Sequence, residues 1–318
     1  MKIQNVSSAN YNISYEGRIP KFKLRRMRLS DKYITNFVDA MIEGAKVPEK
    51  QTSGIYTRLF VTTEEIPIAI KNAGKDQTFK SWLVHSICPS DNYCIFLHGG
   101  TSNVSDKQYQ KLYAKLSDYD INVLAVEYPG YGVNKELKAT VDTYTESAEA
   151  AYKYLTEVLE VPAEKISVMG YCIGGYAAAN LARKFKCNSL FLISPMTSLI
   201  QTGEGYLKSK NLTRNFSFIQ KLLSKSMLFK FKLMNKFNTN KILNEVDTPV
   251  YMFSSYKDVV FDIKWMDKLA RKLRQSEKEI TYFSGYGQGH KFTDRKINLA
   301  ADILARDVYG AEPLQMRY

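Results

Sequence analysis

The segment 165–175 constrains the fold of this chain more than any other part of its sequence. It begins with an apolar run at 166–169 that is typical of a buried strand. It ends in two glycines, which lead into a run of good helix formers. A strand that turns this sharply into a helix holds the residue at its apex in a strained position beside the helix N-terminus, and Cys172 occupies that apex.

The residues around Cys172 fit a nucleophile. The turn brings strand and helix so close that small residues are needed two positions before and two after it, and Gly170 and Gly174 stand there. The partial positive charge of the helix N-terminus favours a thiolate, and the next backbone N–H can receive an oxyanion. We therefore interpret Cys172 as an attacking group; the alternative is a small, inert, buried cysteine.

The composition fits one large α/β domain in a reducing compartment. The chain has 318 residues, 45% of them hydrophobic, which is enough for a substantial core. Its four cysteines are too few and too irregularly spaced for a disulfide framework or a metal site. With no apolar leader and no apolar stretch of membrane-spanning length, the sequence predicts a cytoplasmic protein. Export of a bacterial protein by a non-Sec route stays an open alternative.

Short apolar runs alternate with helical patterns over most of the chain. The predicted buried strands are 93–97, 122–126, 166–169, 190–193, 250–253 and 279–283, and the predicted helices are 140–160, 175–184 and 262–274. This alternation predicts an α/β fold with a mainly parallel sheet covered on both faces. Ahead of it, 56–61 and 66–70 are predicted to form a hairpin around 62–65, with a further strand at 79–87.

The core is predicted to be interrupted by a basic insertion. We divide the chain into an N-terminal extension (1–55, with a helix at 31–44), a core (56–195 and 248–309), a basic helical lid (196–247) and a C-terminal tail (310–318). The net charge of +13 is concentrated in the lid, where 205–241 contains nine Lys or Arg residues and no Asp or Glu, interleaved with apolar residues.

This lid composition leaves several interpretations open. One is a helical hairpin whose apolar side packs on the core while its lysines are merely solvated. The others are contact with an anionic membrane surface and a cover over a groove for a lipid-like acyl substrate. Nucleic acid is not expected as a partner, because no nucleic-acid-binding motif accompanies the charge.

The loops that follow the apolar runs hold the candidate catalytic residues, because ligands bind at the carboxyl ends of parallel strands. Cysteine attack needs a base and usually a carboxylate that orients it. His290, in a glycine-bracketed loop, is the candidate base, whereas His85 lies in a strand pattern and His98 is expected to shape a glycine turn. Asp258 is the candidate orienting acid, with Asp262 as the runner-up.

A tetrahedral intermediate needs two N–H donors for its oxyanion. The candidates are Ile173, directly after the nucleophile, and Gly100 in the turn that follows the strand at 93–97, with Thr101 as an alternative to Gly100. This chemistry requires no metal or other cofactor, and no His, Cys or Asp cluster has the spacing of metal ligands.

At these motifs the chain resembles the α/β-hydrolase superfamily across about 56–309. The motifs are His98-Gly99-Gly100, Tyr128-Pro129-Gly130-Tyr131-Gly132, Gly170-Tyr171-Cys172-Ile173-Gly174, Asp258 and Gly289-His290. The second of them looks most like α/β-hydrolase-domain serine esterases and thioesterases, which include depalmitoylating enzymes. Those enzymes carry serine at the turn, whereas cysteine there is similar to dienelactone hydrolases.

The resemblance implies a hydrolase that cleaves an ester or thioester through a covalent acyl-enzyme. One alternative is an acyltransferase that uses the same acyl-enzyme on Cys172. Others are a serine hydrolase whose nucleophile has been substituted, and a non-catalytic protein that binds membrane surfaces.

Overall fold

The computed structural model describes residues 62–72, 75–198, 201, 238–258, 260–285 and 289–312. Four predictions fall wholly or mainly outside these residues. They concern the N-terminal extension with its helix at 31–44, the strand at 56–61, most of the lid, and all but three residues of the tail.

One eight-stranded sheet forms the centre of the described structure, in the order β1-β2-β4-β3-β5-β6-β7-β8. Its strands are β1 (Thr63–Asn72), β2 (Lys75–Val84), β3 (Tyr93–Leu97), β4 (Asn122–Val126), β5 (Ile166–Tyr171), β6 (Ser189–Ile193), β7 (Val250–Phe253) and β8 (Ile280–Phe283). The strands from β3 to β8 pair in parallel, whereas β2 runs antiparallel to both β1 and β4. The mainly parallel sheet predicted from the apolar runs is therefore confirmed.

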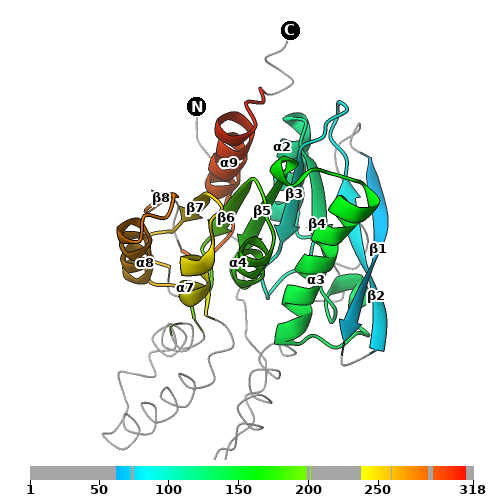
Figure 1. Cartoon of the computed structure of the whole chain (residues 1–318), viewed down its shortest axis with the longest axis horizontal. Helices are drawn as coiled ribbons and strands as arrows, with labels where there is room; N and C mark the ends of the chain where they lie inside the picture. Colours follow the sequence, from blue (N-terminus) through cyan, green and yellow to red (C-terminus); the bar gives the residue numbers. More distant parts are fainter. Residues whose placement is uncertain are drawn as a thin grey trace, which may run out of the picture.

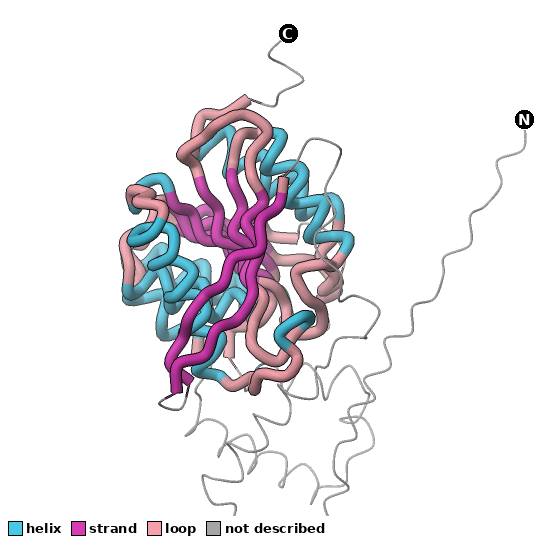
Figure 2. Tube along the Cα trace, turned by 90° about the vertical axis from the view of Figure 1, so that its right-hand side faces the viewer, coloured by secondary structure: helices cyan, strands magenta, loops and turns pink. Residues whose placement is uncertain are grey.

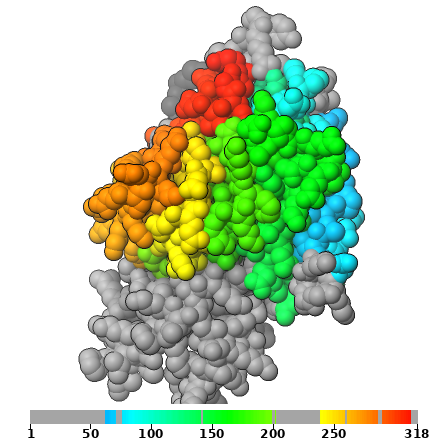
Figure 3. All heavy atoms as spheres, viewed as in Figure 1, coloured from blue at the N-terminus to red at the C-terminus, as the bar shows by residue number. Residues whose placement is uncertain are grey.

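Helices cover both faces of this sheet, as Figures 1 and 2 show. They are α2 (Lys107–Asp118), α3 (Val141–Lys153), α4 (Gly174–Lys184), α7 (Thr239–Ile242), α8 (Ile263–Gln275) and α9 (Asp294–Asp302). α3, α4 and α8 pack on one face, and α2 and α9 on the other. On the first of these faces the segments of α3 and α4 adjoin each other in the space-filling view, the segment of α7 lies between α4 and α8, and α9 lies at one end (Figure 3).

Two separate cores result from the alternation of side chains along each strand. In β3, Ile95 and Leu97 point into the core beneath α3 and α4, while Cys94 and Phe96 point into the core beneath α2 and α9. Strands buried on both faces have no polar side to expose, which is why their sequences read as uniform apolar runs.

The predicted hairpin turn at 62–65 is wrong. Residues 63–65 lie inside β1, which pairs with β2 from Thr63 opposite Val84 to Asn72 opposite Lys75. β1 lies at the edge of the sheet and buries only alternate side chains, among them Ile66 and Ile68. Polar residues on its exposed side therefore do not interrupt the strand, although in the sequence they look like a turn.

The two ends of the predicted lid lie side by side where the structure describes them. Ser198 and Asn238 form an isolated antiparallel bridge, and the Thr239 hydroxyl donates to the Met196 carbonyl at 2.5 Å. The chain therefore leaves the core after β6 and returns to it before β7 at the same place.

Within the described ranges, no helix is both long and apolar enough to cross a membrane.

Candidate active site

Cys172 lies in the sharp turn between β5 and α4. Its φ is +56°, in the left-handed region that residues with a Cβ rarely adopt. A Cβ on Gly170 would come within 2.4 Å of the Gly174 carbonyl oxygen, and one on Gly174 within 2.1 Å of the Leu97 carbonyl oxygen. The two flanking glycines are therefore required by the close approach of strand and helix, as the sequence predicts.

Backbone hydrogen bonds fix this turn against β6. The Cys172 N–H donates to the Ile193 carbonyl at 3.1 Å, while the Cys172 carbonyl accepts from the N–H groups of Gly175 and Met196. The side chain of Cys172 is only partly buried. Hydrogen bonds to both its N–H and its carbonyl thus hold Cys172 in the strained conformation, while its side chain remains partly exposed.

His290 is held in the loop between β8 and α9 by a buried carboxylate. Its Nδ1 lies 3.0 Å from Oδ2 of Asp258, whose side chain is 2% exposed. Oδ1 of Asp258 accepts from the N–H groups of Val260 and Phe261, each at 2.9 Å. Burial alone would raise the pKa of Asp258, but His290 and these two donors lower it below its usual value, so the carboxylate is ionised.

The other side of His290 faces Cys172. Burial lowers the pKa of His290, but the charge of Cys172 and hydrogen bonds to Cys172 and Asp258 outweigh this and raise it to about 9. A protonated imidazole beside a thiolate is the resting form that makes cysteine nucleophilic. The structure thus brings the three residues proposed as nucleophile, base and acid into one contiguous row.

Two aromatic rings fix the orientation of His290. The Tyr171 ring stacks on the imidazole with centroids 5.4 Å apart, and the Phe261 ring meets it edge-on at 5.0 Å. The Tyr171 hydroxyl also donates to the His290 carbonyl at 2.7 Å. Sequence analysis missed both contacts, because nothing near Tyr171 or Phe261 in the sequence indicates that His290 is their neighbour.

The two predicted oxyanion donors lie next to each other. A Cβ on Gly100 would lie 3.4 Å from Cγ2 of Ile173, so the turn after β3 adjoins the N-terminus of α4. The Tyr131 hydroxyl donates to the Gly100 carbonyl at 3.3 Å and fixes the orientation of this turn. Backbone N–H groups at two such positions can receive the charge that develops on a carbonyl oxygen.

A buried contact between a histidine and a carboxylate supports the same turn. His98 and Glu127 are both inaccessible to solvent, and His98 Nε2 lies 2.9 Å from Glu127 Oε1. The other ring nitrogen of His98, Nδ1, lies 2.9 Å from the Gly99 carbonyl oxygen. These contacts fit the expectation that His98 shapes its loop, while the role of Glu127 was missed.

The remaining candidates lie outside this row. Asp262, the runner-up acid, is the N-cap of α8 and accepts from the Lys264 N–H at 3.0 Å. His85 Nε2 lies 3.5 Å from Glu64 Oε2 in the hairpin of β1 and β2. Among the described residues, no three His, Cys, Asp or Glu side chains gather so as to hold a metal ion.

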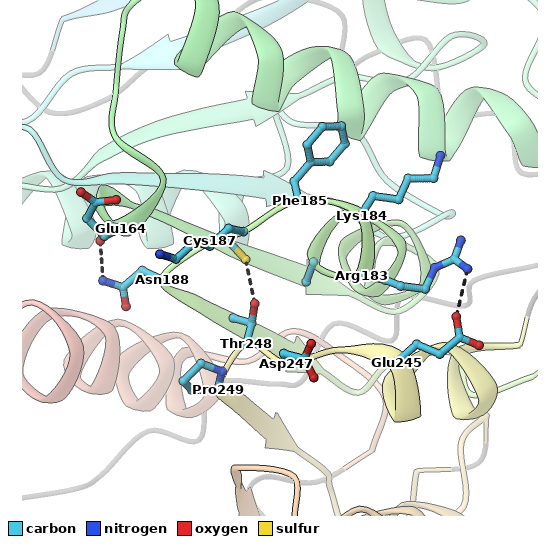
Figure 4. Close-up of a pocket in the computed structure, with 12 residues that line it drawn as sticks. Glu164, Arg183, Lys184, Phe185, Cys187, Asn188, Glu245, Asp247, Thr248 and Pro249 are labelled. Carbon is cyan, nitrogen blue, oxygen red and sulfur yellow. Dashed lines mark hydrogen bonds and ion pairs between the residues drawn. The ribbon is translucent and has the colours of Figure 1, made fainter.

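A hollow of about 640 Å³ lies at the opposite edge of the sheet (Figure 4). It is lined by residues that precede β5, β6 and β7, such as Glu164, Asn188 and Pro249. Several of its charged groups are already paired, for example Arg183 with Glu245 at 3.2 Å. Cys172, Asp258 and His290 instead follow the carboxyl ends of their strands, so this hollow is not part of the candidate active site.

The topology and the turn at Cys172 define an α/β-hydrolase fold, and the comparisons agree. The family model "Serine aminopeptidase, S33" matches residues 89–236. Alpha/beta hydrolase domain-containing protein 17C from Mus musculus is 30% identical over 112 residues, which are 35% of this chain and 34% of the mouse protein. The human protein of the same name is also 30% identical over 112 residues, which are 35% of this chain and 33% of that protein. The match thus spans about a third of the length of these relatives.

Solved structures resemble the chain over most of its length. The Pyrococcus furiosus esterase Pf2001 has a TM-score of 0.63 at 16% identity, covering 83% of this chain and 97% of that one. An α/β hydrolase from Vibrio vulnificus has a TM-score of 0.62 at 19% identity, covering 87% and 94%. The chain therefore has the α/β-hydrolase fold, and its family match and relatives support a hydrolase.

Proposed function

We propose that this protein is a hydrolase that cleaves an ester or thioester through a covalent acyl-enzyme on Cys172. The observation that carries the proposal is the row Asp258–His290–Cys172, in which the carboxylate holds Nδ1 of the imidazole and the thiol meets the imidazole from the other side. This is the arrangement of acid, base and nucleophile that acyl transfer needs.

The reaction follows from this arrangement in two stages. The Cys172 thiolate attacks the carbonyl carbon, and the N–H groups of Ile173 and Gly100 receive the oxyanion. Protonated His290 then gives its proton to the leaving alcohol or thiol as the carbon–oxygen or carbon–sulfur bond breaks. In the second stage neutral His290 takes a proton from water, which attacks the thioester and releases the carboxylic acid and Cys172.

A lipid-like acyl group is the substrate that the lid composition favours. The basic lid at 196–247 combines lysines with large apolar residues, which suits a cover over an acyl chain and contact with an anionic membrane surface. The structural neighbours include esterases from Pyrococcus furiosus and Rhizomucor miehei, which supports ester chemistry. Most of the lid lies outside the described residues, so the acyl preference rests on its sequence.

The test is a panel of p-nitrophenyl esters and acyl thioesters of graded chain length, with intact mass recorded beside product release. The proposal expects turnover together with an added acyl mass on Cys172. Cys172→Ala is expected to lose both, and His290→Ala is expected to slow turnover by about 10²-fold or more. Turnover that is unchanged in Cys172→Ala would contradict the proposal.

Three further experiments separate the alternatives. An acyl-enzyme on cysteine transfers readily to amines and thiols, so product made from an added acceptor would indicate an acyltransferase. If Cys172→Ser is much more active than the native protein, the cysteine is a replacement for a catalytic serine. A non-catalytic membrane protein would give neither adduct nor turnover but would sediment with vesicles in proportion to their anionic lipid content.

A further inference from the structure

Lys296 is a fully buried lysine in the first turn of α9, two helical positions after Asp294. Its ammonium group donates to the carbonyl oxygens of Lys291 at 2.8 Å, Gly289 at 3.2 Å and His290 at 3.4 Å. It also donates to the hydroxyl oxygen of Ser194 at 3.0 Å. A lysine is almost never fully buried without such partners, because removing its charge from water is costly.

The acceptors of Lys296 belong to two parts of the active site. Three of them are successive carbonyls of the loop that carries His290. The fourth belongs to Ser194, the residue directly after β6, whose N–H donates to the Phe253 carbonyl at the end of β7 at 2.9 Å. Lys296 therefore joins the loop of the candidate base to the carboxyl edge of the sheet.

The mechanism proposed above does not use Lys296, and its surroundings are too closed for it to meet a substrate. Its contacts nevertheless reach the backbone of His290, whose carbonyl accepts from both Lys296 and the Tyr171 hydroxyl. A shift of about 1 Å in a catalytic group can cost about 10²-fold in rate, so the position of this backbone matters for catalysis.

We propose that Lys296 is a positioning residue that clamps the His290 loop onto the sheet and so keeps the imidazole aligned between Cys172 and Asp258. The inference rests on the proposed function, in which His290 serves as acid and base. Lys296 acts through the backbone of His290 and not on the substrate.

The charge of Lys296 adds to this effect. Burial lowers its pKa to about 8, while the negative charges of Asp258 and Cys172 act in the opposite direction. The interaction is mutual, so the ammonium group favours the ionised form of Asp258, the carboxylate that holds His290.

The test compares Lys296→Met with Lys111→Met. Lys111 also touches α9, through Asp294 at 2.8 Å, but it lies on the surface, so its loss controls for removal of a lysine beside this helix. Lys296→Met is expected to lower kcat by about tenfold or more while KM changes by less than about threefold. Lys111→Met is expected to keep the kcat and KM of the native protein.

A second measurement does not depend on turnover. The rate at which iodoacetamide alkylates Cys172, followed by peptide mass across pH, reports the thiolate directly. In Lys296→Met this rate is expected to be lower than in the native protein and in Lys111→Met, because a displaced imidazole no longer contacts the thiol. A lysine that only supports folding would lower the unfolding temperature and leave the alkylation profile of the folded protein unchanged.

The outcomes separate the two proposals. If the native protein turns over acyl substrates and folded Lys296→Met has the same kcat and the same alkylation profile, the role of Lys296 is overturned. The proposed function is then left intact. A changed alkylation profile in Lys296→Met, without turnover of any acyl substrate by the native protein, would support the role of Lys296 and count against the proposed function.

If Lys296→Met does not fold, Ser194→Ala removes one acceptor of the Lys296 ammonium group without exposing a carbonyl. It is expected to shift both readouts in the same direction by a smaller amount, and unchanged readouts would again overturn the inference.

Discussion

The hydroxyl of Tyr171 donates to the carbonyl of His290 at 2.7 Å while its ring stacks on the imidazole. Tyr171 is the residue immediately before Cys172, so the strand that carries the nucleophile also holds the base. Tyr171 therefore helps to set the separation between Cys172 and His290, together with the contacts that Lys296 makes to the His290 loop.

Tyr171→Phe keeps the ring and removes this hydrogen bond. We expect kcat/KM to fall about three- to tenfold and the free energy of unfolding to fall by about 1 kcal/mol, because the net contribution of such a bond is modest. Steady-state kinetics and urea unfolding provide the measurements. Tyr93→Phe, in β3, removes a hydroxyl far along the sheet from this row and is the matched control. A fall in kcat/KM of equal size in both variants would show that the Tyr171 hydroxyl has no special role.

Asp258→Asn removes the charge that orients and stabilises protonated His290. We expect kcat/KM to fall by about 10²- to 10⁴-fold, the range seen when the acid of a triad is made neutral. Asp262→Asn is the control, because asparagine caps a helix about as well as aspartate, and it should change kcat/KM by less than about twofold. The opposite ranking would assign the orienting role to Asp262.

The stability of the protein should depend on the protonation of His290. Its pKa rises from 6.5 to about 9 in the folded state, so the folded protein binds this proton more tightly than the unfolded chain. The resulting stabilisation is complete below pH 6.5 and is lost as the pH rises through about 9. Urea unfolding at a pH below and a pH above this window measures the loss.

Asp258→Asn tests the cause of this pH dependence. A hydrogen bond to Asp258 and the charge of this carboxylate both raise the pKa of His290, so the variant should lose less stability across the same window than the native protein. A carboxylate does not titrate in this window, and the other groups that do are common to both proteins and cancel in the comparison. An equal loss in the two proteins would mean that Asp258 and His290 do not form an ion pair.

Gly174→Ala should damage the fold through a backbone clash. The added methyl group would lie 2.1 Å from the Leu97 carbonyl oxygen, and neither backbone can move without disturbing the sheet. We expect a loss of about 3 kcal/mol or more in the free energy of unfolding. Gly310→Ala is the control: its φ is +62° but nothing lies within 4 Å, so it should cost only about 1 kcal/mol. Chemical unfolding of both variants gives the comparison.

The sequence predicts the sheet and the turn at Cys172 well, because both depend on local pattern. Strands buried on two faces must be apolar at nearly every position, and the turn needs Gly170 and Gly174 for steric reasons alone. The edge strand β1 is harder to predict, since Thr63 and Glu65 are tolerated on its exposed side and look like part of a turn. Helix α2 has no counterpart among the predicted helices.

The supporting residues of the site could not be predicted, because their roles depend on neighbours that are distant in sequence. Lys296 in a helical first turn looks like a solvated surface lysine until the loop of His290 folds around it. Glu127 likewise acquires its role only through His98, which follows a different strand, β3. A pattern search finds the reacting groups, whereas the residues that hold them become visible only in three dimensions.

The order of Cys172 and His290 along the chain has a consequence for synthesis. Cys172 is translated 118 residues before His290, and β7, β8 and their connections must follow before the base exists. At ordinary rates of translation this interval is on the order of ten seconds. During that time a nascent chain can form the turn at Cys172 but cannot pair its thiol with the imidazole, so chemistry at this cysteine begins only when the sheet is complete.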